Sequence, residues 1–384
     1  MKVRVLHGLG TMNPGGVETW LMHVLRNIDR ERFQLDICTF GNQPGLYAPE
    51  VEKLGGRILR CPKGTNLLSF RHRFRKILRE GNYDVVHSHV HLFSGTLLRW
   101  AKAEGVPVRI AHSHTSRDDR PNTPPRTSYR RLMKSWIDRC ATHGLAASRL
   151  AAAQLFGKDW ESDRRFQVLY YGIDLAPFQE PVSPKEVRAE LGIPIEALVV
   201  GHVGRFVPAK NHRYLLEIAE EILKRRPEVH FLLVGDGPLR QETEATARTK
   251  GFAERMHFVG IRTDVPRLMR GAMDLFILPS LYEGFGLTLL EAQAAGLHCL
   301  VSDSVPDEIR VLSESVDFLG LSRGASYWST SAIQWLDTPR SSAASMIDIM
   351  SQSEFTINRS LQGLRRIYEM QEPSELPLAA RRHA

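Results

Sequence analysis

The sequence alternates between short apolar runs typical of strands and longer amphipathic runs typical of helices, and it does so twice. The first series runs from Val3–His7 to Phe166–Tyr170, and the second from Leu198–Val203 to Cys299–Ser302. Strands separated by helices predict a parallel sheet covered on both faces. The segment 171–184 between the two series is rich in proline and has no periodicity, which is typical of a linker. The sequence therefore predicts two α/β domains of similar size.

The length of the chain fits this division. At about 100 to 200 residues per domain, 384 residues are expected to form two domains. We place the first at residues 1–175 and the second at 185–350, with a helix at 355–370 that would cross back to the first domain. No apolar run reaches the roughly 18 residues that span a bilayer, and no signal peptide is recognisable, so a cytoplasmic location is expected. The four cysteines lie far apart, which predicts free thiols.

The charge of the chain points to anionic partners. Lys and Arg number 51 against 43 Asp and Glu, a formal net charge of +8. Two segments, 67–79 and 129–139, combine apolar residues at helical spacing with many cations. Such helices can dock on an anionic membrane surface at the inner face of a membrane, although core packing with a solvated charged face is the commoner reason for the pattern. Nucleic acid is not expected, because no known binding signature accompanies the charge.

One candidate site follows the first strand of the second series. The apolar run ending at Val203 leads into Gly204 and Arg205, and Lys210 follows five residues later. Open α/β sheets bind ligands at the carboxyl ends of their strands, so this loop can aim both cations into the binding crevice. A guanidinium and an ammonium together suit a diphosphate. Taken alone, the motif is equally well explained by two surface cations.

A second loop strengthens this hypothesis. The buried run 275–280 leads into a turn in which Gly284 and Gly286 would let the backbone approach a ligand, and a helix is expected to start near Leu287. The free N–H groups of Phe285, Gly286 and Leu287 would then form an anion site, with Glu283 before the helix and Glu291 about one turn into it. Carboxylates accept hydrogen bonds from hydroxyls, so one glutamate could bind a sugar and the other a ribose. The alternative is a capping Glu283 and a solvated Glu291.

These segments resemble the donor domain of retaining glycosyltransferases of family 4, which have the GT-B fold. The resemblance is carried by 204–210, by Val234-Gly235-Asp236-Gly237-Pro238, and by Glu283 and Glu291 with seven residues between them. The first half is similar more loosely, through 13–18 and through 112–116, so the resemblance covers about residues 1–310. It implies an α/β fold with two Rossmann-like domains facing each other across a cleft. Similar members of the family serve exopolysaccharide or capsule assembly.

The resemblance also implies roles for individual residues. The diphosphate would be bound by Arg205 and Lys210, the transferred sugar by Glu283 and the ribose by Glu291. The remaining implied contacts are His114 close to the sugar and Gly15 and Gly16 beside the phosphates. The family's usual asparagine before Gly-Val/Ile-Asp is here Tyr171, which puts that hinge contact in doubt.

The histidines support a competing hypothesis. His87, His89 and His91 alternate along an expected strand, and His112 and His114 follow the next one, an arrangement that zinc could use. A metallohydrolase would also need carboxylates on the same face. Asp84 lies an odd number of residues from His87, so on a strand it would point to the opposite face. We therefore prefer a polar strand end lining the interdomain cleft for His87 and His89, and we expect no metal.

The sequence as a whole predicts a metal-independent enzyme that moves a sugar from a nucleoside diphosphate sugar to a lipid-linked or saccharide acceptor with retention. A UDP-sugar is the first expectation for the donor, and no other cofactor is expected. No D-x-D pair is apparent, so cations and the helix terminus must stabilise the departing diphosphate. Two alternatives remain, a nucleotide-sugar epimerase of the same fold and a non-catalytic nucleotide-sugar binding protein.

Overall fold

The first half of the chain forms a parallel sheet. The computed structural model describes residues 2–118, 120–339 and 343–369. Within these residues seven strands pair in the order β3-β2-β1-β4-β5-β6-β7. Their bounds are β1 (Val3–Leu9), β2 (Phe33–Thr39), β3 (Ile58–Arg60), β4 (Val85–Ser88), β5 (Val108–Ser113), β6 (His143–Ala146) and β7 (Phe166–Val168). The chain order reverses between β1 and β4, which makes the carboxyl ends of these strands the topological switch point.

Helices cover this sheet because each presents one apolar face. They are α1 (Gly16–Asn27), α2 (Ala48–Lys53), α3 (Leu67–Gly81), α4 (Ser94–Ala103), α5 (Pro124–Cys140) and α6 (Arg149–Phe156). In α3 the side chain of Asn66 accepts hydrogen bonds from the first-turn N–H groups, and Phe70, Phe74 and Leu78 are buried on the sheet side. The helix is followed by its C-cap residue Asn82, which has a φ of +44°.

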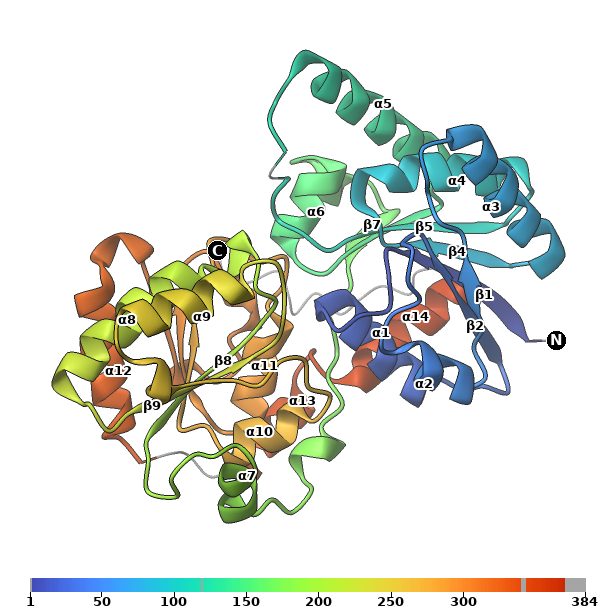
Figure 1. Ribbon diagram of the computed structural model, residues 1–384. Coiled ribbons are helices and arrows are strands. Elements are labelled where there is room, and N and C mark those ends of the chain that lie inside the picture. The colour runs from blue at the N-terminus through green and yellow to red at the C-terminus, as the bar shows by residue number, and fades with distance from the viewer. Residues whose placement is uncertain (1, 119, 340–342, 370–384) are drawn as a thin grey trace.

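The second half repeats the same design. Its strands are β8 (Val199–Val203), β9 (His230–Val234), β10 (Met256–Phe258), β11 (Leu275–Leu278), β12 (His298–Ser302) and β13 (Val316–Leu319). They pair in the order β10-β9-β8-β11-β12-β13, so the switch point lies between β8 and β11. The helices are α7 (Pro184–Glu190), α8 (His212–Arg225), α9 (Arg240–Thr249), α10 (Val265–Gly271), α11 (Leu287–Ala294), α12 (Ala325–Leu336) and α13 (Ala343–Gln352). Two Rossmann-like parallel sheets are confirmed (Figure 1).

The last described helix, α14 (Ile357–Tyr368), returns to the first sheet. It lies beside α1, as the red and blue helices in Figure 1 show. Trp20 Nε1 donates to Ser360 Oγ at 2.9 Å, and Arg32 of the first half pairs with Glu369 just after the helix. Residue 370, the end of the expected crossover helix, lies outside the described residues. The linker is packed rather than loose, because Tyr171 and Ile173 are buried and Ile173 bridges to Thr356.

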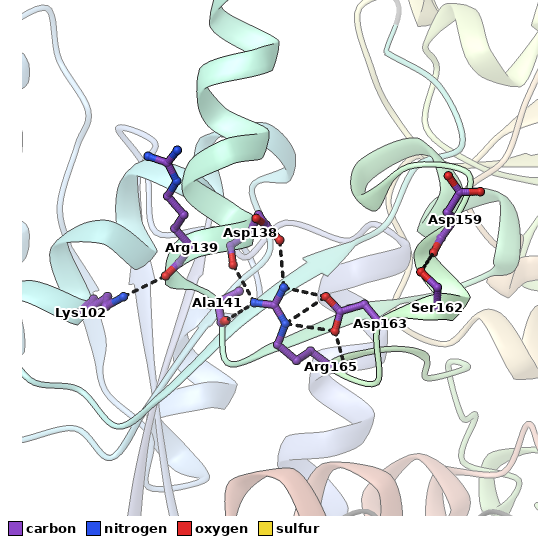
Figure 2. A network of polar contacts seen from close by, with 8 residues as sticks. All are labelled: Lys102, Asp138, Arg139, Ala141, Asp159, Ser162, Asp163 and Arg165. Carbon is purple, nitrogen blue, oxygen red and sulfur yellow. Dashed lines mark hydrogen bonds and ion pairs between the residues drawn. The ribbon is translucent and has the colours of Figure 1, made fainter.

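Polar contacts hold the outer edge of the first sheet in place. Figure 2 shows the guanidinium of Arg165, just before β7, between two carboxylates. Its Nη2 donates to Asp138 Oδ1 at 2.9 Å and to Asp163 Oδ2 at 2.6 Å, and its Nη1 donates to the carbonyl of Asp138 at 2.6 Å. The end of α5 is thereby joined to the residues that lead into the edge strand β7.

Several short elements escaped the sequence analysis. They are α2, β3, β6, α7, β13, α12 and α13. β3 has three residues and β6 reads His-Gly-Leu-Ala, so neither has the β-branched run that marks a strand. The prediction that β4 extends through three alternating histidines was wrong: the strand ends at Ser88, and His91 opens a 3-10 helix at a φ of +49°.

All four cysteines are buried and free, as expected. No helix in the described ranges combines the length and the apolar character needed to cross a bilayer.

Candidate active site

The loops that leave β8 and β11 meet at the switch point of the second sheet. Gly204 follows β8, and the loop after β9 packs closely against the loop that contains Gly204. A Cβ on Gly235, which has a φ of +136°, would lie 2.0 Å from the Gly204 carbonyl oxygen. Only glycine allows this approach, and it fixes the backbone that carries Arg205.

Lys210 and Glu283 form an ion pair across these loops. Lys210 Nζ lies 2.5 Å from Glu283 Oε1, and the same oxygen accepts a hydrogen bond from Ser280 Oγ at 2.6 Å. The side chains are 16% and 11% exposed, so the pair is largely shielded from water. The structure thus brings together two of the expected site residues and adds Ser280, which holds the carboxylate.

Arg205 projects from the same loop but is exposed. The positive charge of Arg205 acts on Glu18 of α1 in the first domain and favours the ionised form of this carboxyl group. Burial nevertheless raises the pKa of Glu18 to about 7, because desolvation outweighs that attraction. Arg205 and α1 therefore face each other between the two domains.

The glycine-rich turn after β11 starts α11 as predicted. Gly286 occupies the N-cap position with a φ of +98°, and the flanking Phe285 and Leu287 are 3% and 5% exposed. The first-turn N–H groups point out of the start of an eight-residue helix, where they favour an anion. Glu291 lies one turn further on, and burial raises its pKa to about 8. The alternative of a solvated Glu291 is wrong, because this residue is 7% exposed.

Gly284 has a different role from the expected one. A Cβ at this position would lie 1.9 Å from the carbonyl oxygen of His114, so its missing side chain allows contact with the first domain rather than with a ligand. Two serines of the first domain reinforce the contact: Ser116 Oγ donates to the Glu283 carbonyl and Ser148 Oγ to the Gly284 carbonyl, both at 2.6 Å. His114 is thereby placed directly against the turn that carries Glu283.

Gly15 and Gly16 lie at the start of α1, at the switch point of the first sheet. The Glu18 carboxylate folds back over Gly15, where its Oε2 would lie 2.6 Å from an added Cβ. Gly16 is open, with nothing within 4 Å of its Cβ position. An acidic side chain thus occupies the space before this helix where the resemblance implies a phosphate.

Histidines fill the interior beside this switch point. Two triplets, His7 with His87 and His89, and His89 with His112 and His114, have ring nitrogens within 4.8 Å of one another. His87 is fully buried beneath Tyr368 of α14, so the expectation that it lines the cleft was wrong. Burial lowers the pKa of His114 to about 3, which leaves its ring neutral.

Four residues join the candidate site that the sequence analysis had not assigned: Glu18, His7, Ser280 and Tyr368. Glu18 lies in the segment 13–18 that carries part of the resemblance, and its spacing from Gly15 is typical of a first-turn carboxylate. Ser280 lies three residues before Glu283. Nothing in the sequence linked Tyr368 to His87, which lies 281 positions earlier.

The comparisons with known proteins agree with this architecture. Residues 184–321 match the family of glycosyl transferases group 1, and residues 15–172 match the glycosyl transferase 4-like domain. EpsF of Bacillus subtilis (strain 168), a protein named as a glycosyltransferase, is 33% identical over 383 residues, which cover 96% of each chain. The UDP-Gal:alpha-D-GlcNAc-diphosphoundecaprenol alpha-1,3-galactosyltransferase of Escherichia coli is 30% identical over 64% of each chain.

The chain is also similar to a capsular polysaccharide glycosyltransferase and to a solved glycosyltransferase-like structure. The capsular polysaccharide biosynthesis glycosyltransferase CapH of Staphylococcus aureus is 24% identical over 95% of this chain and 98% of its own. The crystal structure of HepE from Anabaena, in complex with UDP and glucose, superimposes with a TM-score of 0.75 at 20% identity, covering 96% of this chain and 99% of that one. The chain belongs to the glycosyltransferases of family 4, with the GT-B fold.

Proposed function

We propose that this glycosyltransferase moves a sugar from a nucleoside diphosphate sugar, first of all a UDP-sugar, to a lipid-linked or saccharide acceptor, with retention and without a metal ion. The observation that carries the proposal is the cluster of Lys210, Glu283 and the start of α11 at the switch point of the second sheet. HepE, which has the same fold, was crystallised with UDP and glucose. A cation, an anion site and a buried carboxylate are the groups that a sugar diphosphate requires.

The charged groups have separate tasks in this proposal. Arg205, Lys210 and the N–H groups at the start of α11 bind the diphosphate and stabilise the charge that develops as it leaves. Binding would draw Lys210 towards phosphate and free Glu283 to accept hydrogen bonds from sugar hydroxyls. Glu291, one turn into the helix, would accept from the ribose.

Retention follows if the acceptor attacks the same face that the diphosphate leaves. The acceptor hydroxyl forms the new bond to the anomeric carbon, and its proton passes to the departing phosphate oxygen. His114 and the loop around Gly16 belong to the opposite domain and would close over the sugar and the phosphates. This proposal needs no side-chain nucleophile, and it assigns Glu283 to binding and positioning.

The acceptor is proposed to be carried by a membrane lipid, within exopolysaccharide or cell-surface glycan synthesis. Similarity to the Escherichia coli enzyme and to CapH supports this class, because their names specify a diphosphoundecaprenol substrate and capsular polysaccharide. On the surface of the first domain, Leu67 and Leu68 are 53% and 73% exposed at the start of α3, beside exposed cations such as Arg71. Exposed leucines next to cations suit peripheral contact with an anionic bilayer.

A panel of nucleotide sugars tests the proposal. Thermal unfolding should identify the donor, since a ligand at 100 times its dissociation constant adds about 2.7 kcal/mol of stability. The selected donor is then incubated with the enzyme, with and without lipid extract, and the products are analysed. Released UDP together with a glycosylated lipid supports transfer. An isomerised nucleotide sugar identifies an epimerase, and binding without any turnover identifies a non-catalytic binding protein.

A further inference from the structure

The proposed function uses one histidine of the first domain, but five of them are hydrogen-bonded together. In the first row, Tyr171 Oη contacts His114 Nδ1, His114 Nε2 lies 2.8 Å from His89 Nδ1, and His89 Nε2 lies 3.0 Å from His7 Nδ1. Both ring nitrogens of His114 and of His89 are therefore engaged within the row. We call these four residues, together with the three of the second row below, the histidine chain.

The second row crosses from the sheet to the last helix. His112 Nδ1 lies 3.0 Å from His87 Nε2, and His87 Nδ1 lies 2.8 Å from the hydroxyl of Tyr368 in α14. The Tyr368 hydroxyl also lies 3.4 Å from His7 Nε2, which joins the two rows. The histidine chain thus runs without interruption from His112, through α14, to Tyr171 in the interdomain linker.

One end of the chain determines the direction of every hydrogen bond. Among the described residues His112 Nε2 is buried and has no hydrogen-bond partner. Orphaned buried N–H groups are rare, so the proton of neutral His112 belongs on Nδ1, from which it donates to His87. A neutral imidazole has one N–H, so His87 then donates from its own Nδ1 to Tyr368.

The same rule carries through the first row. Tyr368 donates to His7 Nε2, and His7, His89 and His114 each donate from Nδ1 to the next member. The Tyr171 oxygen accepts the last of these bonds, and its own proton is free for a further acceptor. Glu18 lies close enough to Tyr171 to raise the pKa of this hydroxyl electrostatically, in addition to the larger effect of burial. The chain therefore ends beside the carboxyl group that faces Arg205.

The same geometry disfavours a metal ion. A metal in either triplet would need three lone pairs, and in the arrangement derived above each of the lone pairs of His7, His87, His89 and His114 already accepts a hydrogen bond. Burial also lowers the pKa of His7 to about 3 and those of His87, His89 and His112 well below the usual range. Neutral rings with one donor and one acceptor are what the chain requires.

We propose that the histidine chain is a polarised positioning element: it holds all five histidines as Nδ1–H tautomers, and through them Tyr368 of α14 fixes the orientation of His114 and Tyr171 beside the donor site. Tyr171 and Tyr368 are positioning residues, because they act on the substrate through His114. The chain also joins the linker to the last helix. Its importance for transfer rests on the function proposed above, whereas its tautomers do not.

Nitrogen NMR of histidine-labelled protein tests the tautomers directly. The ligand-free wild type should show five neutral Nδ1–H rings at pH 7, assigned by their loss in single histidine variants. Tyr368→Phe removes the hydroxyl that joins the rows and should change the tautomer mixture at His114. Tyr83→Phe is the matched control, because the buried Tyr83 donates to Asp36 at 2.8 Å outside the chain. Nε2–H or charged rings in the wild type, or an unchanged His114 signal in Tyr368→Phe, would overturn the proposal.

Kinetics test whether the chain serves transfer. Tyr368 is buried at the end of α14 and touches no proposed ligand, so Tyr368→Phe should lower kcat roughly fivefold or more while the donor KM changes by less than about twofold. Tyr83→Phe should leave both unchanged. The folded fraction of Tyr368→Phe is measured by circular dichroism. If the loss of activity is no larger than the loss of folded protein, the histidine chain has only a structural role and the proposal is overturned.

Two outcomes separate this inference from the proposed function. If no nucleotide sugar is turned over but the five tautomers are as stated, the proposed function fails and the histidine chain stands as a structural assignment. Transfer could instead occur in a protein for which metal analysis finds about one zinc or copper ion per molecule, lost in His89→Gln. The histidine chain would then be a metal site, and this inference would fail.

Discussion

The two halves of this glycosyltransferase share a strand order but differ at their switch points. In the second half the loops after β8 and β11 present charged groups, with Lys210 paired to Glu283 and Arg205 exposed. In the first half the corresponding interior is filled by neutral histidines that bond to one another. The same fold therefore presents charged groups at the sheet edge of one domain and an uncharged hydrogen-bonded network in the other.

This difference separates two tasks. Binding a diphosphate requires positive charge that remains partly accessible, and Lys210 keeps 16% of its side chain exposed. Orienting a reacting group requires rigidity, which burial and complete hydrogen bonding provide. We therefore expect substitutions in the second half to affect both donor binding and the rate of transfer, and substitutions in the histidine chain to affect the rate with little change in donor binding.

The largest effect is expected from the cations. Arg205→Ala or Lys210→Ala should reduce transfer a hundredfold or more, about 2.7 kcal/mol of transition-state stabilisation, because each removes charge opposite the leaving diphosphate. Arg213→Ala is the control, since this side chain is 93% exposed on α8. The measurement is the steady-state rate of the wild type and of each variant at saturating donor. A variant of either site residue that keeps more than about a third of the activity would contradict the diphosphate assignment.

The two glutamates should separate binding from chemistry. Glu291→Gln should weaken the binding of bare UDP about tenfold, because the amide leaves one acceptor oxygen for the ribose hydroxyls where the buried carboxyl group has two oxygens. Glu283→Gln should leave UDP affinity nearly intact and slow the chemical step. Calorimetry and single-turnover kinetics measure the two quantities. Equal losses of UDP affinity in both variants would show that the donor lies the other way round.

The pH dependence of stability tests the burial of Glu291. Its pKa is raised to about 8 in the folded protein, whereas an unfolded glutamate titrates near about 4.3. The folded state therefore binds more protons than the unfolded state between these pH values, and the free energy of unfolding falls as pH rises through this window. Glu291→Gln should lose this part of the slope, by about 1 kcal/mol or more between pH 5 and pH 8.

Urea unfolding of the wild type, Glu291→Gln and Glu242→Gln at both pH values provides the measurement. Glu242 is exposed on α9, so its variant should keep the wild-type slope. Part of the slope should persist in every variant, because burial also raises the pKa of Glu18 to about 7. Parallel wild-type and Glu291→Gln profiles would show that Glu291 is not buried as described.

The smallest expected effect is that of a chelator. Because side chains and backbone N–H groups carry the charge in this account, exhaustive dialysis against EDTA should leave the transfer rate within about twofold of the untreated enzyme. If the rate vanishes and returns with manganese or zinc, a metal ion stabilises the leaving diphosphate, and the histidines of the first half become its candidate ligands.

The sequence predicted those parts of the fold that depend on local, repeated patterns of apolar residues and glycines. The spacing of strands and helices predicted both sheets, and the glycines around Phe285 predicted the start of α11. It could not predict the histidine chain, because that network depends on strand neighbours such as β1 and β4 and on a helix at the far end of the chain. The pairing of Lys210 with Glu283 likewise joins two loops separated by 73 positions, a distance over which spacing carries no information.

Gly284 shows why even a correct motif can be misinterpreted. The glycine lies where the pattern requires, but its missing side chain makes room for the carbonyl group of His114. Sequence patterns indicate that a backbone approaches something closely and do not identify the neighbour. Here the neighbour is the other domain, so the prediction of the loop was right and the reason given for its first glycine was wrong.

Thermal unfolding with UDP tests most directly the claim that Arg205 and Lys210 of the second half bind the diphosphate. The wild type and His114→Gln should both be stabilised by about 2.7 kcal/mol at 100 times the wild-type dissociation constant, because bare UDP has no sugar for His114 to contact. The double variant Arg205→Ala/Lys210→Ala should gain almost nothing at the same concentration. Full stabilisation of the double variant, or its loss in a folded His114→Gln, would contradict the division of tasks between the two domains.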